Sequence, residues 1–249
     1  MKLCPLKASE NTLKNIRKLA RQLKEEGGSF EVFSPVPKIS PQFLILIGNG
    51  TPDDLILAIL AHKFNGSTFV FLVRPEVRRN IPAIRTIPTL IKQAGVKIRK
   101  ILFLVDQETQ LNLEKIFIKV ESLLQKEKVK ILQEERSGRL EVLTCSFQGK
   151  EFDLILVING LDRPYQKHSI EDHLLEALRL TSILPQNKLE KLVQEAGNDP
   201  KRAWWEKVEK KTQLQILAAL HQMNKERLRE IFPQQYQAFQ LFLSSKNQV

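Results

Sequence analysis

The chain has 249 residues, 42% of them hydrophobic, and a net charge of +11, which suits one large or two small globular domains with a basic surface. The sequence has no run of 18 apolar residues, so we expect no membrane span. The basic N-terminal segment lacks an apolar stretch with a cleavage site, so we expect no secretory signal and a cytoplasmic location. Cys4 and Cys145 stand far apart without histidines at ligand spacing, which argues against a disulfide framework or a cysteine zinc site.

The first predicted element is an amphipathic helix at residues 10–25, followed by a linker to residue 40. Short apolar runs rich in β-branched and aromatic residues then predict parallel strands that are covered on both faces. Helical patterns between these runs indicate β-α-β alternation. The predicted central strands are residues 43–47, 68–73, 101–105 and 152–158, the helices between them are 52–64, 87–94 and 111–126, and an added strand pair is 129–133 and 140–147.

Beyond Pro185 the pattern is helical throughout, with helices expected at residues 187–196, 203–223, 225–231 and 233–243. The predicted fold class is therefore α/β, an open and mostly parallel sheet with helices on both faces and a helical C-terminal cap. We expect three parts: residues 1–40 with the N-terminal helix and linker, the α/β domain at 41–184, and a helical subdomain at 185–249.

Positive charge is concentrated in one segment of the chain. Residues 74–100 hold eight Lys or Arg side chains against the single acid Glu76. Such a segment attracts phosphates and favours a nucleic-acid partner, and its alternative interpretation is a solvated basic surface. The candidate nucleic-acid-binding residues are Arg74, Arg78, Arg79, Arg85, Lys97, Arg99 and Lys100, with Lys201 and Arg202 as further candidates.

Polar clusters follow the predicted strands, at the edge of an open α/β sheet where ligands usually bind. The first, residues 48–54, includes Asn49 and Asp53 and could hold an anion or a metal, or Asp53 and Asp54 could simply favour the start of the next helix. Asp53 stands where a dinucleotide-binding loop needs its third glycine, and no phosphate-binding Gly-Lys-Ser/Thr loop follows any strand, so nicotinamide binding is not expected.

Two later clusters add carboxylates. Asp106 and Glu108 directly follow a predicted strand, and their oxygens suit a hard cation such as Mg²⁺, although Asp106 could instead cap the next helix. Near residue 170, Ser169 and Asp172 fit a helix capping box, which leaves Glu171 free to point elsewhere. Residues 159–162 favour a turn over a ligand set.

The order of these clusters resembles TOPRIM domains, which occur in topoisomerases, primases, recombination mediators and nucleases. The pattern runs from Asn49-Gly50-Thr51-Pro52-Asp53 through Asp106-Gln107-Glu108 to Ser169-Ile170-Glu171-Asp172, the last resembling small stand-alone TOPRIM-like proteins of bacteria and archaea. The resemblance implies catalytic roles for Asn49, Asp53 and Asp106. It also implies that Asp106, Glu108 and Glu171 bind Mg²⁺ or Mn²⁺ against a phosphodiester.

One position departs from the TOPRIM pattern. Asn49 stands where the family carries a glutamate thought to act in proton transfer, and an amide cannot titrate. Three functions follow: a Mg²⁺-dependent nuclease or phosphoryl-transfer enzyme of weak activity, a non-catalytic nucleic-acid- or partner-binding module, or a protein that binds a nucleotide or other small molecule. Trp204 and Trp205 beside basic residues could stack on single strands, although packing in the core is the favoured interpretation.

Overall fold

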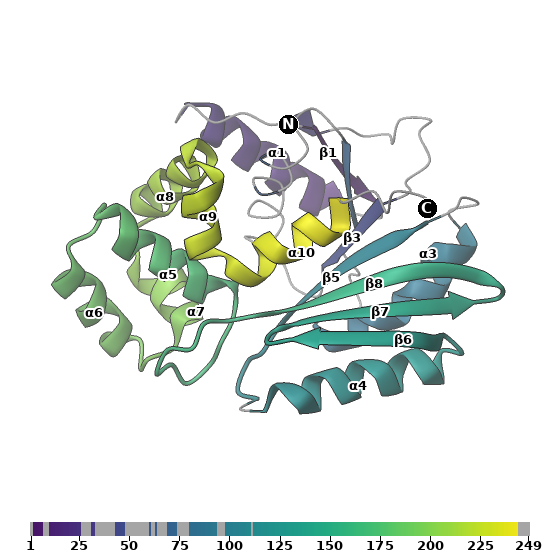
Figure 1. Cartoon of the computed structure of the whole chain (residues 1–249). Coiled ribbons are helices and arrows are strands. Elements are labelled where there is room, and N and C mark those ends of the chain that lie inside the picture. The colour runs from purple at the N-terminus through teal and green to yellow at the C-terminus, as the bar shows by residue number, and fades with distance from the viewer. Residues whose placement is uncertain are drawn as a thin grey trace.

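The computed structural model contains an eight-stranded sheet with helices against both faces (Figure 1). It describes residues 2–6, 10–25, 31–32, 43–47, 60, 63, 69–73, 80–93, 98–110 and 112–243. The strand order across the sheet is β2-β1-β4-β3-β5-β8-β7-β6. The strands are β1 (Lys2–Leu6), β2 (Glu31–Val32), β3 (Phe43–Ile47), β4 (Phe69–Val73), β5 (Lys100–Asp106), β6 (Lys130–Ser137), β7 (Leu140–Phe147) and β8 (Lys150–Asn159).

The predicted α/β class and its central parallel strands are confirmed. β3 pairs with β5 and β5 pairs with β8, both in parallel, whereas β6 and β7 form the added antiparallel pair beside β8. β5 is buried along its whole length, as expected for a strand covered on both faces. Its continuous apolar sequence is thus explained by helices above and below it.

Alternate residues of the central strands face two separate hydrophobic cores. On one face Phe103 and Leu156 pack with residues of η1 (Ile81–Thr86), α3 (Ile87–Gln93) and α4 (Leu113–Lys126). On the other face Leu102 and Ile155 pack with the C-terminal helices, and Figure 1 shows α10 crossing this side of β5 and β8. The helices on this side include α5 (Ile170–Thr181), α6 (Gln186–Glu195), α7 (Pro200–Arg202), α8 (Lys210–Gln222), α9 (Lys225–Ile231) and α10 (Pro233–Leu243).

The C-terminal helices share one hydrophobic core with the sheet. The single helix predicted at residues 203–223 is wrong in one respect, because the chain forms a π-helical turn, η2 (Ala203–Lys207), and then breaks at Val208 before α8. Gln213 Nε2 donates to the carbonyl groups of Trp204 and Val208 at 2.5 and 3.1 Å. These bonds satisfy backbone groups that a continuous helix would have paired internally.

The N-terminal segment contributes to the sheet as well as supplying α1 (Glu10–Glu25). β1 pairs in parallel with β4 over five residues, and β2 adds a two-residue edge next to β1. The helix predicted at residues 10–25 is confirmed, and the two short strands extend the sheet beyond the predicted α/β domain. The predicted division at residues 40 and 184 stays a prediction.

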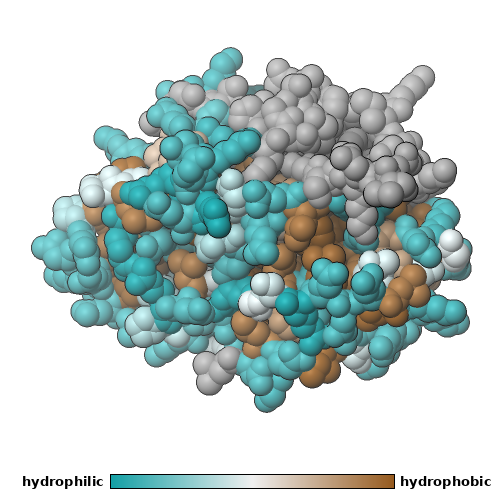
Figure 2. Space-filling view, in the orientation of Figure 1, coloured by the Kyte–Doolittle hydropathy of each residue, from teal (hydrophilic) through white to brown (hydrophobic). Residues whose placement is uncertain are grey.

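The described surface is mixed in polarity. On the face shown in Figure 2, hydrophilic residues predominate and hydrophobic residues appear among them at both the helical end and the strand end. No helix in the described parts of the chain is long and apolar enough to cross a bilayer. The large hydrophobic side chains that stay exposed there are Ile118, Leu132, Trp205 and Leu241.

A candidate site at the carboxyl edge of the sheet

The ends of β5 and β8 bring Asp106 and Asn159 side by side. The two residues are direct partners in the parallel register, and Asn159 Nδ2 donates to Asp106 Oδ1 at 3.0 Å. Both side chains are buried, with exposed fractions of 2% and 1%. A buried carboxylate therefore closes the carboxyl end of the central strand, which is where ligands bind in open α/β sheets.

A second buried carboxylate comes from the first turn of α5. Glu171 is 2% exposed, and its Oε1 accepts a hydrogen bond from Trp205 Nε1 at 2.8 Å. Its Oε2 is buried and has no hydrogen-bond partner among the described residues. Burial, followed by repulsion from Glu171, raises the pKa of Asp106 to about 7. Two buried acids thus share one site, and their negative charge is only partly compensated.

Glu108 and Lys201 stand at the rim of this carboxylate pair. Lys201 Nζ lies 3.9 Å from Glu108 Oε1, and both side chains are partly exposed. The charge of Lys201 lowers the pKa of Asp106, whereas Glu108 makes only a small contribution that raises it. The structure therefore joins Asp106 with Glu171 and leaves Glu108 paired with a lysine at the entrance.

The backbone fixes Glu108 in an uncommon conformation. Its φ is +57°, in the left-handed region, and its N–H and carbonyl exchange hydrogen bonds with His168 at 2.8 and 2.9 Å. This bridge ties the segment after β5 to the segment before α5. The two carboxylate-bearing segments are consequently held at a fixed separation.

A chain of buried amides links Asp106 to the C-terminal helices. Gln235 Nε2 donates to Asn159 Oδ1 at 3.0 Å and lies 3.1 Å from His173 Nε2. His173 Nδ1 donates to the Ile231 carbonyl at 2.6 Å, and burial lowers the pKa of His173 to about 4, so the ring is neutral and its Nε2 accepts. With both nitrogens engaged, His173 supports the site from within the fold and does not contact a ligand.

Gly160 lies next to this network of buried amides. Its N–H faces His173 Nε2 at 3.4 Å, and its carbonyl accepts from Gln234 Nε2 at 2.8 Å. A Cβ on Gly160 would come within 2.7 Å of His168 Cβ, and φ there is +134°. The turn predicted at residues 159–162 is not formed as such, because Asn159 ends β8 and irregular chain follows, in which only glycine fits at position 160.

The start of α5 behaves as its sequence predicts. Asp172 Oδ1 accepts a hydrogen bond from the Ser169 backbone N–H at 3.1 Å, and Asp172 Oδ2 contacts His168 Nδ1 at 2.8 Å. Asp172 is therefore engaged in capping and in holding His168. This leaves Glu171 as the acid of the pair whose charge acts on Asp106.

Arg99 and Lys100 of the basic segment lie away from the carboxylate pair, although Asn80 Nδ2 of the same segment donates to the Asp106 carbonyl at 3.3 Å. Arg99 precedes β5 and Asp106 ends it, so their backbones are about 23 Å apart at the usual rise per residue. Arg85 forms an ion pair with Glu127 at 3.7 Å. Lys100 is 7% exposed and donates from Nζ to the Leu241 carbonyl at 2.6 Å, which fastens the end of α10 to the sheet.

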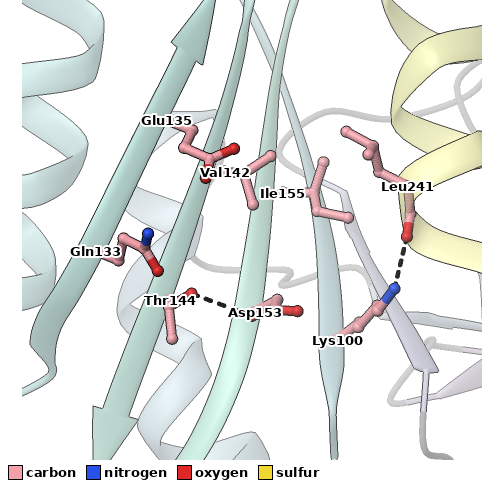
Figure 3. Close-up of a pocket in the computed structure, with 8 residues that line it drawn as sticks. All are labelled: Lys100, Gln133, Glu135, Val142, Thr144, Asp153, Ile155 and Leu241. Atoms are coloured by element: carbon pink, nitrogen blue, oxygen red, sulfur yellow. Dashed lines mark hydrogen bonds between the residues drawn. The ribbon is translucent and has the colours of Figure 1, made fainter. Parts of the chain in front are cut away.

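Lys100 and Leu241 border a second hollow, on the face of β6–β8 beside α10 (Figure 3). Polar and apolar side chains alternate along it, and Thr144 Oγ1 donates to Asp153 Oδ1 at 3.3 Å. Its charged side chains, Lys100, Glu135 and Asp153, come from three strands, and Lys100 Nζ is engaged by the Leu241 carbonyl. We therefore place the candidate site at the carboxyl edge and not in this hollow.

Several candidate residues fall outside the described parts of the chain. They are Asn49, Asp53, Arg74, Arg78, Arg79 and Lys97. β3 ends at Ile47, opposite Leu104 of β5, at the same edge of the sheet as Asp106. The convergence of these residues with Asp106 stays a prediction.

The sequence-based expectation of a divalent cation concerns Asp106, Glu108 and Glu171, and it stays a prediction. In the described residues no group of three or more His, Cys, Asp or Glu side chains could hold a metal ion by itself. Mg²⁺ commonly uses one or two carboxylates together with waters and substrate phosphates, and the unpartnered Glu171 Oε2 is an available oxygen. Asp106 and Glu171 are thus the two side chains suited to hold such an ion.

The sequence analysis did not assign four residues to this site: Asn159, Lys201, Trp205 and Gln235. Asn159 could have been found from its place at the end of a strand that neighbours β5. Gln235 lies 76 residues further along the chain, and no local signal marks it.

Comparison with known proteins does not assign this chain to a family. No family model matches it, and no curated protein or solved structure shows significant similarity to it. Its function is therefore argued from the site itself.

Proposed function

We propose that this protein binds nucleic acid through its phosphates at the carboxyl edge of the sheet, where Asp106 and Glu171 hold Mg²⁺ or Mn²⁺. The observation that carries the proposal is the buried pair of carboxylates with an unpartnered oxygen on Glu171. Bringing two acids together out of water is unfavourable unless a cation or a proton lies between them. Lys201, which pairs with Glu108 beside the two acids, compensates only part of their charge and could contact a phosphate bound to the cation.

The positive charge around the pair favours a phosphate ligand. Residues 201–211, which follow the sequence KRAWWEKVEKK, carry five Lys or Arg against two Glu. Lys201, Arg202 and Lys210 are exposed. A field of this sign attracts a phosphate chain toward the cation, whereas a small ligand does not need so many exposed bases.

The cation defines what chemistry the site could support. Mg²⁺ or Mn²⁺ bound by Asp106 and Glu171 would neutralise phosphate oxygens and stabilise charge that develops during phosphoryl transfer. Lys201 would orient a phosphate beside it. We place binding ahead of strand cleavage, because Asn49 stands where the TOPRIM resemblance implies a titratable glutamate.

Replacing the entrance lysine tests this proposal. We expect Lys201→Gln to weaken binding of a fluorescently labelled oligonucleotide in Mg²⁺ and to reduce the slope of log Kd against log salt by about 0.7–0.9, since one phosphate contact is lost. Fluorescence anisotropy at several salt concentrations measures both quantities. Chelation of the cation should also weaken binding by the wild type.

Lys191→Gln is the matched control. Lys191 belongs to α6 on the helical side, is 75% exposed and lies 3.9 Å from Glu195, so its loss removes the same charge away from the site. We expect its Kd and salt slope to match those of the wild type. Equal effects of the two variants would show that net charge alone drives binding, and no binding by the wild type would reject the proposal.

A further inference from the structure

An exposed indole ring lies directly beside the carboxylate pair. Trp205 is 42% exposed, whereas its neighbour Trp204 is 1% exposed and packs in the core. Trp205 Nε1 donates to the buried Glu171 Oε1 at 2.8 Å. The ring of Trp205 is therefore held in place by the same side chain that we assign to the cation.

Consecutive helical residues point about 100° apart, so one of the two adjacent tryptophans faces the core and the other the surface. They belong to the π-helical turn η2, whose wider winding differs from that of the α8 helix after it. Such turns often occur at functional sites. The indole ring of Trp205 is thus left at the surface with one end fixed by a hydrogen bond to a buried carboxylate, so its exposed face is available to a ligand.

One basic side chain contacts the ring and others come from nearby positions in the chain. Lys210 Nζ lies 5.7 Å from the centroid of Trp205, and the exposed Arg202 of the preceding turn pairs with Glu206 at 3.5 Å. Lys201 reaches from the same region to the rim of the carboxylate pair. An aromatic plane thus stands among cations, next to a carboxylate site.

We propose that this platform, which consists of Trp205, Lys201, Arg202 and Lys210, stacks an unpaired base of single-stranded nucleic acid. The inference rests on the proposed function and specifies its substrate class. Basic side chains attract the phosphates of single strands and duplexes alike, but the faces of paired bases are covered by their neighbours. Only an unpaired base can lie on the ring of Trp205, whereas an acidic protein would use the charges without needing the aromatic plane.

Substitutions at Trp205 separate stacking from charge. We expect Trp205→Ala to raise the Kd for labelled single strands of about 12 nucleotides roughly tenfold, and to change the Kd for the matching duplex less than about twofold. Trp205→Phe loses the hydrogen bond to Glu171 but keeps an aromatic ring, so its Kd should stay within about threefold of the wild-type value. Anisotropy with DNA and RNA arms, in Mg²⁺, measures these values.

An abasic position moved along the oligonucleotide gives a second readout. Wild-type affinity should fall when the abasic position reaches the stacked base, and Trp205→Ala should be insensitive to it. Two results would contradict the stacking inference and leave the proposed function standing. In the first, the wild type binds nucleic acid but Trp205→Ala lowers the affinity for single strands and for duplex equally. In the second, polyglutamate displaces the labelled strand as well as unlabelled DNA does. If the wild type binds no nucleic acid, both are wrong.

Discussion

Gly160→Ala should lower the free energy of unfolding by about 3 kcal/mol or more, one of the largest effects expected of a single methyl group in this protein. The added Cβ would lie 2.7 Å from His168 Cβ and 3.2 Å from Arg139 Nη1. His168 cannot withdraw easily, because its backbone exchanges two hydrogen bonds with Glu108. A φ of +134° adds backbone strain for any side chain. Urea unfolding monitored by circular dichroism measures the loss.

Gly149→Ala is the matched control for Gly160→Ala. Gly149 also has a positive φ, +77°, but nothing lies within 4 Å of its would-be Cβ. We expect a cost of about 1–2 kcal/mol there, from the backbone conformation alone. Equal losses for the two variants would contradict the close packing of Gly160 against His168.

His173→Leu should also cost about 3 kcal/mol, because it keeps apolar volume but leaves several buried polar groups without a partner. The ring of His173 donates to the Ile231 carbonyl and accepts from the Gly160 N–H and from Gln235. Leucine can replace none of these bonds. Denaturant unfolding at pH 7, where the histidine is neutral, measures the effect.

A double-mutant cycle with Gln235→Leu isolates the contact between the two side chains. His173→Leu removes one of the two contacts of the Gln235 amide, and the double variant removes that contact only once, so its cost should be less than the sum of the single costs. Additive costs would contradict the polar chain that joins α5, α10 and Asn159. A deficit of about 0.5–3 kcal/mol would support it.

The central sheet could be predicted because its signals are local. Apolar runs such as residues 43–47 and 101–105 are too short for most helices and rich in strand-forming side chains, and their order implies parallel crossovers. β1 and β2 could not be predicted in the same way. β1 is only five residues long and contains Pro5, which argues against a strand interior, and β2 has two residues; both exist because they pair with the sheet.

Half of the candidate site was visible in the sequence. Asp106 is recognisable as an acid at the end of a predicted strand. Ser169 and Asp172 mark the start of a helix as its capping residues, so Glu171 is not needed for capping. The pairing of Asp106 with Asn159 depends on strand order, and the support from Gln235 depends on where α10 docks. These are tertiary contacts between segments distant in sequence, and no local pattern encodes them.

The role of positive charge shows a similar limit. Residues 74–100 form the most basic segment, yet its described members Arg99 and Lys100 lie at the far end of β5 from Asp106. Lys201 reaches the site instead, because α7 packs against α5. Counting charge along the chain identifies a class of partner but does not locate its binding surface.

The melting temperature with and without a divalent cation tests the Asp106–Glu171 site most directly. If Mg²⁺ binds with a Kd near 1 mM, 10 mM Mg²⁺ should stabilise the wild type by about 1.4 kcal/mol, which raises the melting temperature by about 3–6 °C. Asp106→Asn should be more stable than the wild type in chelator, because the repulsion is gone, and should show no shift with Mg²⁺ or Mn²⁺. Glu195→Gln, a surface change in α6, should keep the wild-type shift. A wild type that does not respond to either cation, or an Asp106→Asn variant that responds equally, would contradict the cation site.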